Sequence, residues 1–164
     1  MKKIGFLVIT LLIGFSAVKA QDALPEITLY DINGNKVNIA DYGKDSTIQI
    51  FSFWATWCVP CKEELNNINE IYADWQKDYN VEIIAVSIDD AKTKANVKSY
   101  AEGQGWTYTV LLDTNKELQR LLGGQSVPFT VITNKAGVIT DKHTGYIEGD
   151  EYELEDKIIV LSKE

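Results

Sequence analysis

Cys58 and Cys61 are the only two cysteines in the 164-residue chain, and two residues separate them. This spacing lets the sulfur atoms close a small disulfide ring without unfolding the surrounding chain. Such a ring is a weak structural staple, because a disulfide stabilises mainly by closing a long loop. A zinc site would need two further ligands, whereas the chain has one histidine, His143, and no second cysteine pair. The pair therefore indicates thiol–disulfide exchange.

The neighbouring elements place the cysteines where a strand gives way to a helix. Residues 48–54 are almost entirely apolar, which predicts a strand buried on both faces. A helical pattern starts near Cys61, and Pro60 suits its first turn. The apolar residues at helical spacing are Leu65, Ile68, Tyr72, Trp75 and Tyr79. A thiolate at Cys58 is then stabilised by the helix dipole and the free N–H groups, which can lower a thiol pKa from ~8.5 to roughly 3.5–7.5.

The rest of the chain alternates strand and helix patterns. Polar and apolar residues alternate on both sides of a turn at residues 33–35, which predicts a hairpin within residues 26–39. The further expected elements are strands at 81–88, 109–112, 129–133 and 138–145, and helices at 91–102, 115–122 and around Leu154, Ile158 and Leu161. This order predicts an α/β sandwich with a mixed central sheet flanked by helices.

The first twenty residues have the layout of a secretory signal peptide. Lys2 and Lys3 precede an uncharged apolar stretch at residues 4–15, and small residues stand next to the expected cleavage point after Ala20. We therefore expect one domain over residues 21–164, exported to the periplasm or cell envelope. The apolar stretch is shorter than the ~20 residues of a spanning helix, so an uncleaved membrane anchor is the secondary interpretation.

The chain without its first twenty residues is strongly acidic. All 24 acidic residues lie beyond residue 20, but three of the 16 basic residues do not, which leaves 13 basic residues and a formal charge of −11. Phosphate groups and anionic lipids repel such a chain, which argues against nucleic-acid and membrane-surface partners. We interpret the acidity itself as a solvated surface.

A resemblance to a known family rests on the segment Trp57-Cys58-Val59-Pro60-Cys61 after the first buried strand and on Val127-Pro128 before the late hairpin. This order resembles the thioredoxin fold. The longer segment from Phe53 to Leu65 is more specifically similar to the exported TlpA/ResA-like thiol–disulfide oxidoreductases. The added N-terminal hairpin, the insert at residues 90–112 and the signal peptide agree with that branch.

The resemblance implies a role for each matching position. Cys58 corresponds to the attacking thiol and Cys61 to the resolving thiol. Pro128 corresponds to a cis-proline beside the disulfide, and the alternative is an ordinary trans proline at a strand start. The positions expected to contact a substrate are Trp57, Val59, Pro60 and Val127.

The proton acceptor for the second thiol is the point at which the chain departs from cytosolic thioredoxins. Those proteins carry a buried aspartate in the strand before the motif, and the matching residue here is Ser52. The resemblance instead implies an acid after the next strand, where Asp90 matches best and Asp89 is its neighbour. A buried Asp90 with a raised pKa would suit proton exchange with Cys61. The alternative is that both aspartates only cap the following helix.

The sequence as a whole predicts an enzyme, a thiol–disulfide oxidoreductase of the protein-disulfide reductase type, without a metal or other cofactor. The resemblance favours the reducing direction, including a role in cytochrome c maturation. The expected partners are protein disulfides or dithiols and an electron donor in the membrane or envelope, and we expect a monomer.

Two other functions compete with this prediction. A peroxiredoxin shares the fold but requires a proline and a threonine at the positions of Phe51 and Ala55. A binding domain with an inert disulfide is the non-enzymatic alternative. We expect His143 to be a surface or edge residue, and Trp54, Trp75 and Trp106 to be core aromatics.

Overall fold

The computed structural model describes residues 23–164, and the predicted signal peptide with its cleavage point lies outside them. The strands are β1 Thr28–Asp31, β2 Lys36–Asn38, β3 Ile48–Trp54, β4 Val81–Ser87, β5 Thr109–Leu112, β6 Phe129–Thr133 and β7 Ile139–Thr144. The helices are the 3₁₀ helix η1 Ile39–Lys44, α1 Val59–Tyr79, α2 Ala95–Gly103, α3 Glu117–Leu121 and α4 Asp150–Ser162. None of the helices in the described part of the chain has the length and apolar character needed to cross a membrane.

The seven strands form one mixed sheet in the order β2-β1-β5-β4-β3-β6-β7. Strand β3 runs parallel to β4, and β4 runs parallel to β5. Strand β6 is antiparallel to β3 and forms a hairpin with β7. The hairpin of β1 and β2 extends the same sheet beyond β5. The cysteine motif therefore follows the strand that has β4 on one side and β6 on the other.

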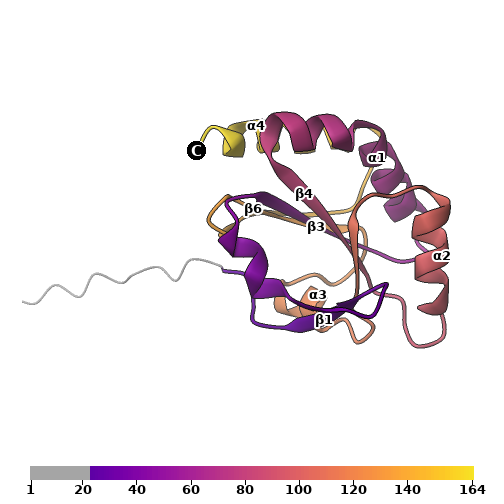
Figure 1. The fold of residues 1–164 in the computed structure, drawn as a ribbon. Coiled ribbons are helices and arrows are strands. Elements are labelled where there is room, and N and C mark those ends of the chain that lie inside the picture. Colours follow the sequence, from indigo (N-terminus) through magenta and orange to yellow (C-terminus); the bar gives the residue numbers. More distant parts are fainter. Residues whose placement is uncertain (1–22) are drawn as a thin grey trace, which may run out of the picture.

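Helices cover both faces of this sheet, which explains the composition of β3. Figure 1 shows α1 and α4 together over one face and α3 with η1 on the opposite side. All seven side chains of β3 are buried, as its apolar sequence predicted. The largest buried side chains include Phe51, Phe53, Trp54 and Trp75. This core holds the end of β3, from which the cysteine loop departs.

The structure confirms the predicted α/β sandwich, its mixed sheet and the added hairpin. Several helix boundaries differ by a few residues from the sequence-based expectation, and two of the helix starts have a direct structural cause. Helix α1 begins at Val59, because Cys58 is its N-cap residue. Helix α2 begins at Ala95, because residues after Asp90 first form a separate turn on the Asp90 carboxylate.

Candidate active site

Cys58 and Cys61 form a disulfide at the start of α1. Their Cα atoms lie 5.4 Å apart, which is within the ordinary range for a disulfide. Cys58 has an extended backbone, and its N–H donates to the Ala55 carbonyl over 3.0 Å. Cys58 keeps 6% of its surface exposed, whereas Cys61 is completely buried. A partner can therefore reach the first sulfur more easily than the second.

The Val127–Pro128 peptide bond is cis, as the resemblance implied. Strand β6 begins at the next residue, Phe129, which is paired with Phe53 near the end of β3. The Pro128 carbonyl also accepts a hydrogen bond of 2.9 Å from the Gly145 N–H. Strand pairing thus brings this distant proline to the end of the sheet where the cysteine loop begins.

Apolar side chains next to the disulfide are exposed to solvent. Trp57 is 57% exposed and Val59 is 58% exposed, although both are large apolar residues. Pro60 and Val127 are half-buried. Exposed apolar side chains beside a reactive group are typical of a binding surface. This exposure is compatible with the substrate contacts that the resemblance implied.

Glu64 is a buried carboxylic acid that the sequence interpretation missed. It lies one helical turn after Cys61, on the same side of α1, and is only 5% exposed. Its Oε1 accepts a hydrogen bond from Thr130 Oγ1 at 3.0 Å, and its Oε2 lies 3.4 Å from the Ser52 hydroxyl. Burial raises the pKa of Glu64 to about 7, although these two hydrogen bonds oppose the shift.

The sequence did contain a signal for Glu64. The buried residues of α1 are Cys61, Glu64, Leu65, Ile68, Tyr72 and Trp75, so Glu64 falls on the apolar stripe of the helix. A charged residue at such a position is rarely buried without a partner or a function.

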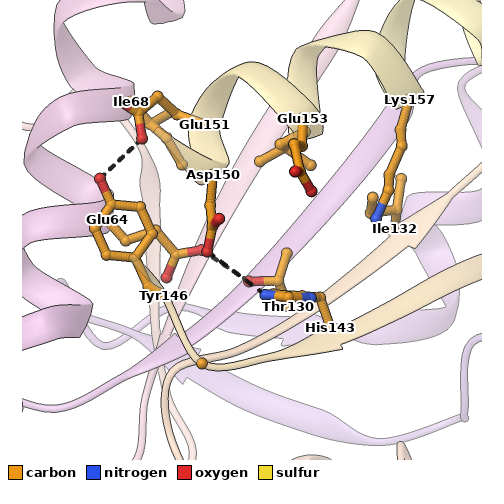
Figure 2. A pocket seen from close by; sticks show the side chains of 12 residues that line it. Glu64, Ile68, Thr130, Ile132, His143, Tyr146, Asp150, Glu151, Glu153 and Lys157 are labelled. Carbon is orange, nitrogen blue, oxygen red and sulfur yellow. Dashed lines mark hydrogen bonds and ion pairs between the residues drawn. The ribbon is translucent and has the colours of Figure 1, made fainter. Parts of the chain in front are cut away.

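A small cavity lies beside Glu64, between α1, α4 and the β6–β7 hairpin (Figure 2). Its volume is about 30 Å³, which is room for about one water molecule. Figure 2 shows two polar pairs in its wall: Tyr146 Oη donates to Glu151 Oε2 at 2.8 Å, and His143 Nε2 lies 3.8 Å from Asp150 Oδ2. Asp150 and Glu151 add negative charge, which further raises the pKa of Glu64.

His143 is an exposed residue on an edge strand, as the sequence predicted. It lies on the edge strand β7 and its side chain is 47% exposed, as expected of an edge residue. The fold nevertheless brings it to the same cavity as Glu64. Trp54, Trp75 and Trp106 are buried core aromatics, as expected.

The expectation of a buried Asp90 with a raised pKa is wrong. Asp90 is exposed, and its Oδ1 accepts hydrogen bonds from the backbone N–H groups of Lys92 and Thr93. These bonds stabilise the charged carboxylate, so they lower the pKa of Asp90. Asp90 therefore closes the turn that precedes α2, and it does not cap that helix as the alternative predicted, because the N-cap residue of α2 is Lys94. Its neighbour Asp89 is buried and bound to the loop before Cys58.

No metal centre is apparent within residues 23–164, since no group of three or more His, Cys, Asp or Glu side chains is arranged to hold an ion. The chemistry that the described site supports is that of its own two sulfurs, with Glu64 as the adjacent acid.

Residues 20–142 of the chain match the AhpC/TSA family. The chain belongs to this family. The thiol–disulfide oxidoreductase ResA of Geobacillus thermodenitrificans is a relative that is 33% identical over 131 residues, covering 79% of this chain and 72% of the relative. ResA of Bacillus subtilis is 29% identical over 133 residues, or 80% and 71% of the two chains. These family members confirm the resemblance on which the roles of Cys58 and Cys61 were predicted.

Solved structures agree with this membership. An uncharacterized thioredoxin-like protein from Porphyromonas gingivalis is 42% identical, has a TM-score of 0.76, and the match covers 87% of this chain and 94% of that one. A putative thiol:disulfide interchange protein DsbE from Chlorobium tepidum has a TM-score of 0.75 over 87% and 96% of the two chains. That protein is 23% identical, so it supports the thioredoxin-like fold alone.

Proposed function

We propose that the chain is a thiol–disulfide oxidoreductase that reduces disulfides of other proteins through Cys58 and Cys61. The observation that carries this proposal is the arrangement around the disulfide. A sulfur that keeps a little exposed surface lies at the N-terminus of α1, a completely buried sulfur follows within one turn, and a buried acid follows within the next. The cis-proline at position 128 lies at the same end of the sheet.

The reaction begins with the dithiol form of the protein. The Cys58 thiolate attacks one sulfur of the partner disulfide, which breaks the partner S–S bond and forms a mixed disulfide with Cys58. The other partner sulfur leaves as a thiolate and takes a proton from solvent. The helix N-terminus favours this step because it stabilises the attacking thiolate.

The second step closes the Cys58–Cys61 disulfide. The Cys61 thiol gives its proton to the Glu64 carboxylate, and its sulfur attacks Cys58 and releases the second partner thiolate. The partner has then gained two electrons, and this chain has lost them. A pKa of about 7 lets Glu64 accept and release a proton near neutral pH, which is what a general base requires.

The resemblance to ResA supports the finer parts of the proposal. The reducing direction, a role in cytochrome c maturation and an electron donor in the membrane or envelope all come from that resemblance. Export of residues 21–164 rests on the layout of the first twenty residues. We propose a monomer in which Trp57, Val59, Pro60 and Val127 contact the partner protein.

The experiment that tests the function combines a reduction potential with a single-turnover assay. The potential is measured by equilibrating the protein with glutathione and dithiothreitol buffers. The fully reduced protein is then mixed with a disulfide-bonded protein such as insulin. We expect a potential nearer to thioredoxin than to the strong oxidant DsbA, which differ by ~150 mV, and stoichiometric reduction of the partner.

The same samples separate the competing functions. A peroxiredoxin would consume hydrogen peroxide rapidly, whereas this chain has Ala55 where such an enzyme needs a threonine hydroxyl. An inert structural disulfide would exchange with neither substrate. A potential close to that of DsbA would overturn the reducing direction while leaving the exchange chemistry intact.

A further inference from the structure

Asp89 is a buried carboxylate whose oxygens bind the loop that leads into Cys58. It follows the end of β4 and is 1% exposed. Its Oδ2 accepts a hydrogen bond of 2.8 Å from the Thr56 backbone N–H, and its Oδ1 accepts one of 2.6 Å from the Thr56 hydroxyl. Two donors from one residue, 33 positions away in the sequence, thus occupy both oxygens of the carboxylate.

Ser87 completes this arrangement from the last position of β4. Its hydroxyl donates to Asp89 Oδ2 at 2.9 Å and accepts from the Asp89 backbone N–H at 3.1 Å. The adjacent Ile88 N–H donates to the Trp54 carbonyl at the end of β3. The parallel strands β3 and β4 at the centre of the sheet therefore fix the position of the Asp89 carboxylate. Because this carboxylate binds Thr56, it also restricts the movement of Thr56.

The loop between β3 and α1 consists of residues 55–58 and lacks regular secondary structure. Thr56 stands at its middle, two positions before Cys58. In the oxidised protein the disulfide itself ties Cys58 to α1. Reduction removes that covalent tie, and the hydrogen bonds between Asp89 and Thr56 remain as a link from the sheet to the loop.

We propose that Asp89 is a positioning residue that holds Thr56, and through it Cys58, at the N-terminus of α1 when the protein is reduced. This role goes beyond the exchange chemistry itself, and it differs from the acid role that the sequence left open for this pair of aspartates. The geometry favours positioning because the Asp89 oxygens accept from Thr56 and Ser87. The role assigned to Glu64 is independent of it.

The direction in which Asp89→Asn shifts the Cys58 pKa distinguishes a positioning role of Asp89 from a purely electrostatic one. Asp89→Asn removes a negative charge near the attacking thiol, and this alone lowers the Cys58 pKa. Asparagine also exchanges one acceptor oxygen for an NH2 donor, so one of the two Thr56 donors loses the oxygen that it binds in the wild type. A loosened loop moves the sulfur away from the helix N–H groups, and this raises the Cys58 pKa.

The test uses the full exported chain with Asp89→Asn, Thr56→Val and Thr56→Ser. Thr56→Val removes the hydroxyl with little change of shape, and Thr56→Ser keeps both donors. Thiolate absorbance against pH gives the Cys58 pKa of the reduced protein, and single-turnover attack on a small disulfide gives the rate. Asp90→Asn is the matched control, because Asp90 is exposed and contacts only its own turn.

We expect Asp89→Asn to raise the Cys58 pKa and to slow attack roughly tenfold, as small misplacements of reacting groups do. Thr56→Val should shift both quantities in the same direction, and Thr56→Ser should restore them. A lowered pKa in Asp89→Asn would overturn the proposal in favour of electrostatics. If Asp89→Asn lowers the Tm but leaves the Cys58 pKa and the rate of attack unchanged, Asp89 only stabilises the fold and the proposal is wrong. If Asp89→Asn does not fold, the comparison of Thr56→Val with Thr56→Ser tests the proposal by itself: equal Cys58 pKa values and rates in the two variants would overturn it.

Discussion

The Glu64 carboxylate lies against the Ser52 hydroxyl, with Oε2 and Oγ 3.4 Å apart. Ser52 stands where cytosolic thioredoxins carry a buried aspartate, so the strand lacks the acid and the helix supplies one in the same place. Thr130 is paired with Ser52 across the sheet and donates to the other oxygen of Glu64. The acid thus reaches Ser52 and Thr130 from helix α1.

This burial predicts that the oxidised protein loses stability as the pH rises. The pKa of Glu64 is about 7 in the folded state against an ordinary value of 4.5, so the folded state holds the proton more tightly than the unfolded chain. Its contribution is complete below pH 4.5 and is lost as the pH rises through 7, a change of about 3 kcal/mol. Denaturant unfolding at a series of pH values measures it.

Glu64→Gln should abolish this part of the pH dependence, because glutamine does not titrate. The variant should match the wild type at acidic pH and exceed its stability above pH 7. Glu63→Gln is the matched control, since Glu63 is exposed on the same helix. Identical pH dependence in the wild type and Glu64→Gln would show that the buried carboxyl does not keep its proton.

Glu64→Gln should also slow release of the partner protein. Glutamine cannot accept the Cys61 proton, so formation of the Cys58–Cys61 disulfide should slow, whereas the initial attack by Cys58 should change little. Quenched-flow trapping of the mixed disulfide measures the two steps separately. If both steps keep their wild-type rates, the general-base role of Glu64 is wrong.

The two cysteines should behave differently when each is replaced by serine. Cys61→Ser should accumulate mixed disulfides, because Cys58, the less buried of the two cysteines, attacks and no second thiol releases the partner. Cys58→Ser should accumulate far fewer, because Cys61 is completely buried. Electrophoresis of the same samples with and without dithiothreitol measures the amount of mixed disulfide in each variant. Equal trapping by the two variants would contradict the assigned order of attack.

Asp90→Asn should affect stability and leave the thiol chemistry unchanged. The Asp90 carboxylate accepts from the N–H groups of Lys92 and Thr93, and an amide is a weaker acceptor than a carboxylate. A small drop in Tm, with unchanged Cys58 pKa and exchange rate, is the expected result. A changed exchange rate would return Asp90 to the list of candidate acids.

The first twenty residues predict an exported protein that begins at Gln21. Lys2, Lys3 and the apolar residues 4–15 carry the signal, and Ala20 precedes the expected cut. Mass spectrometry of the protein isolated from its native envelope measures the N-terminus. An intact chain from Met1 retained in the membrane would favour the uncleaved anchor.

The sequence alone was sufficient for features that depend on neighbouring residues. The spacing of Cys58 and Cys61 determined the chemistry, and the apolar run at 48–54 determined a buried strand. Turn residues around Gly34 and Gly137 determined the two hairpins, and both glycines have the positive φ that such turns need. Each of these signals lies within a few positions, where the preferences of the backbone act directly.

Only the tertiary structure decided which acids are buried close to the cysteine motif and which are exposed. Periodicity predicted that α1 would bury one face, but the contact of Glu64 with Ser52 and Thr130 depends on how α1 packs over the β3–β6 pair. Asp89 and Asp90 are adjacent in the sequence, yet one is buried against Thr56 and the other is in solvent. One aspartate is buried and the other exposed because of where β4 ends relative to the cysteine loop. Such contacts join residues far apart in the chain, and the register and packing that create them come from the whole core.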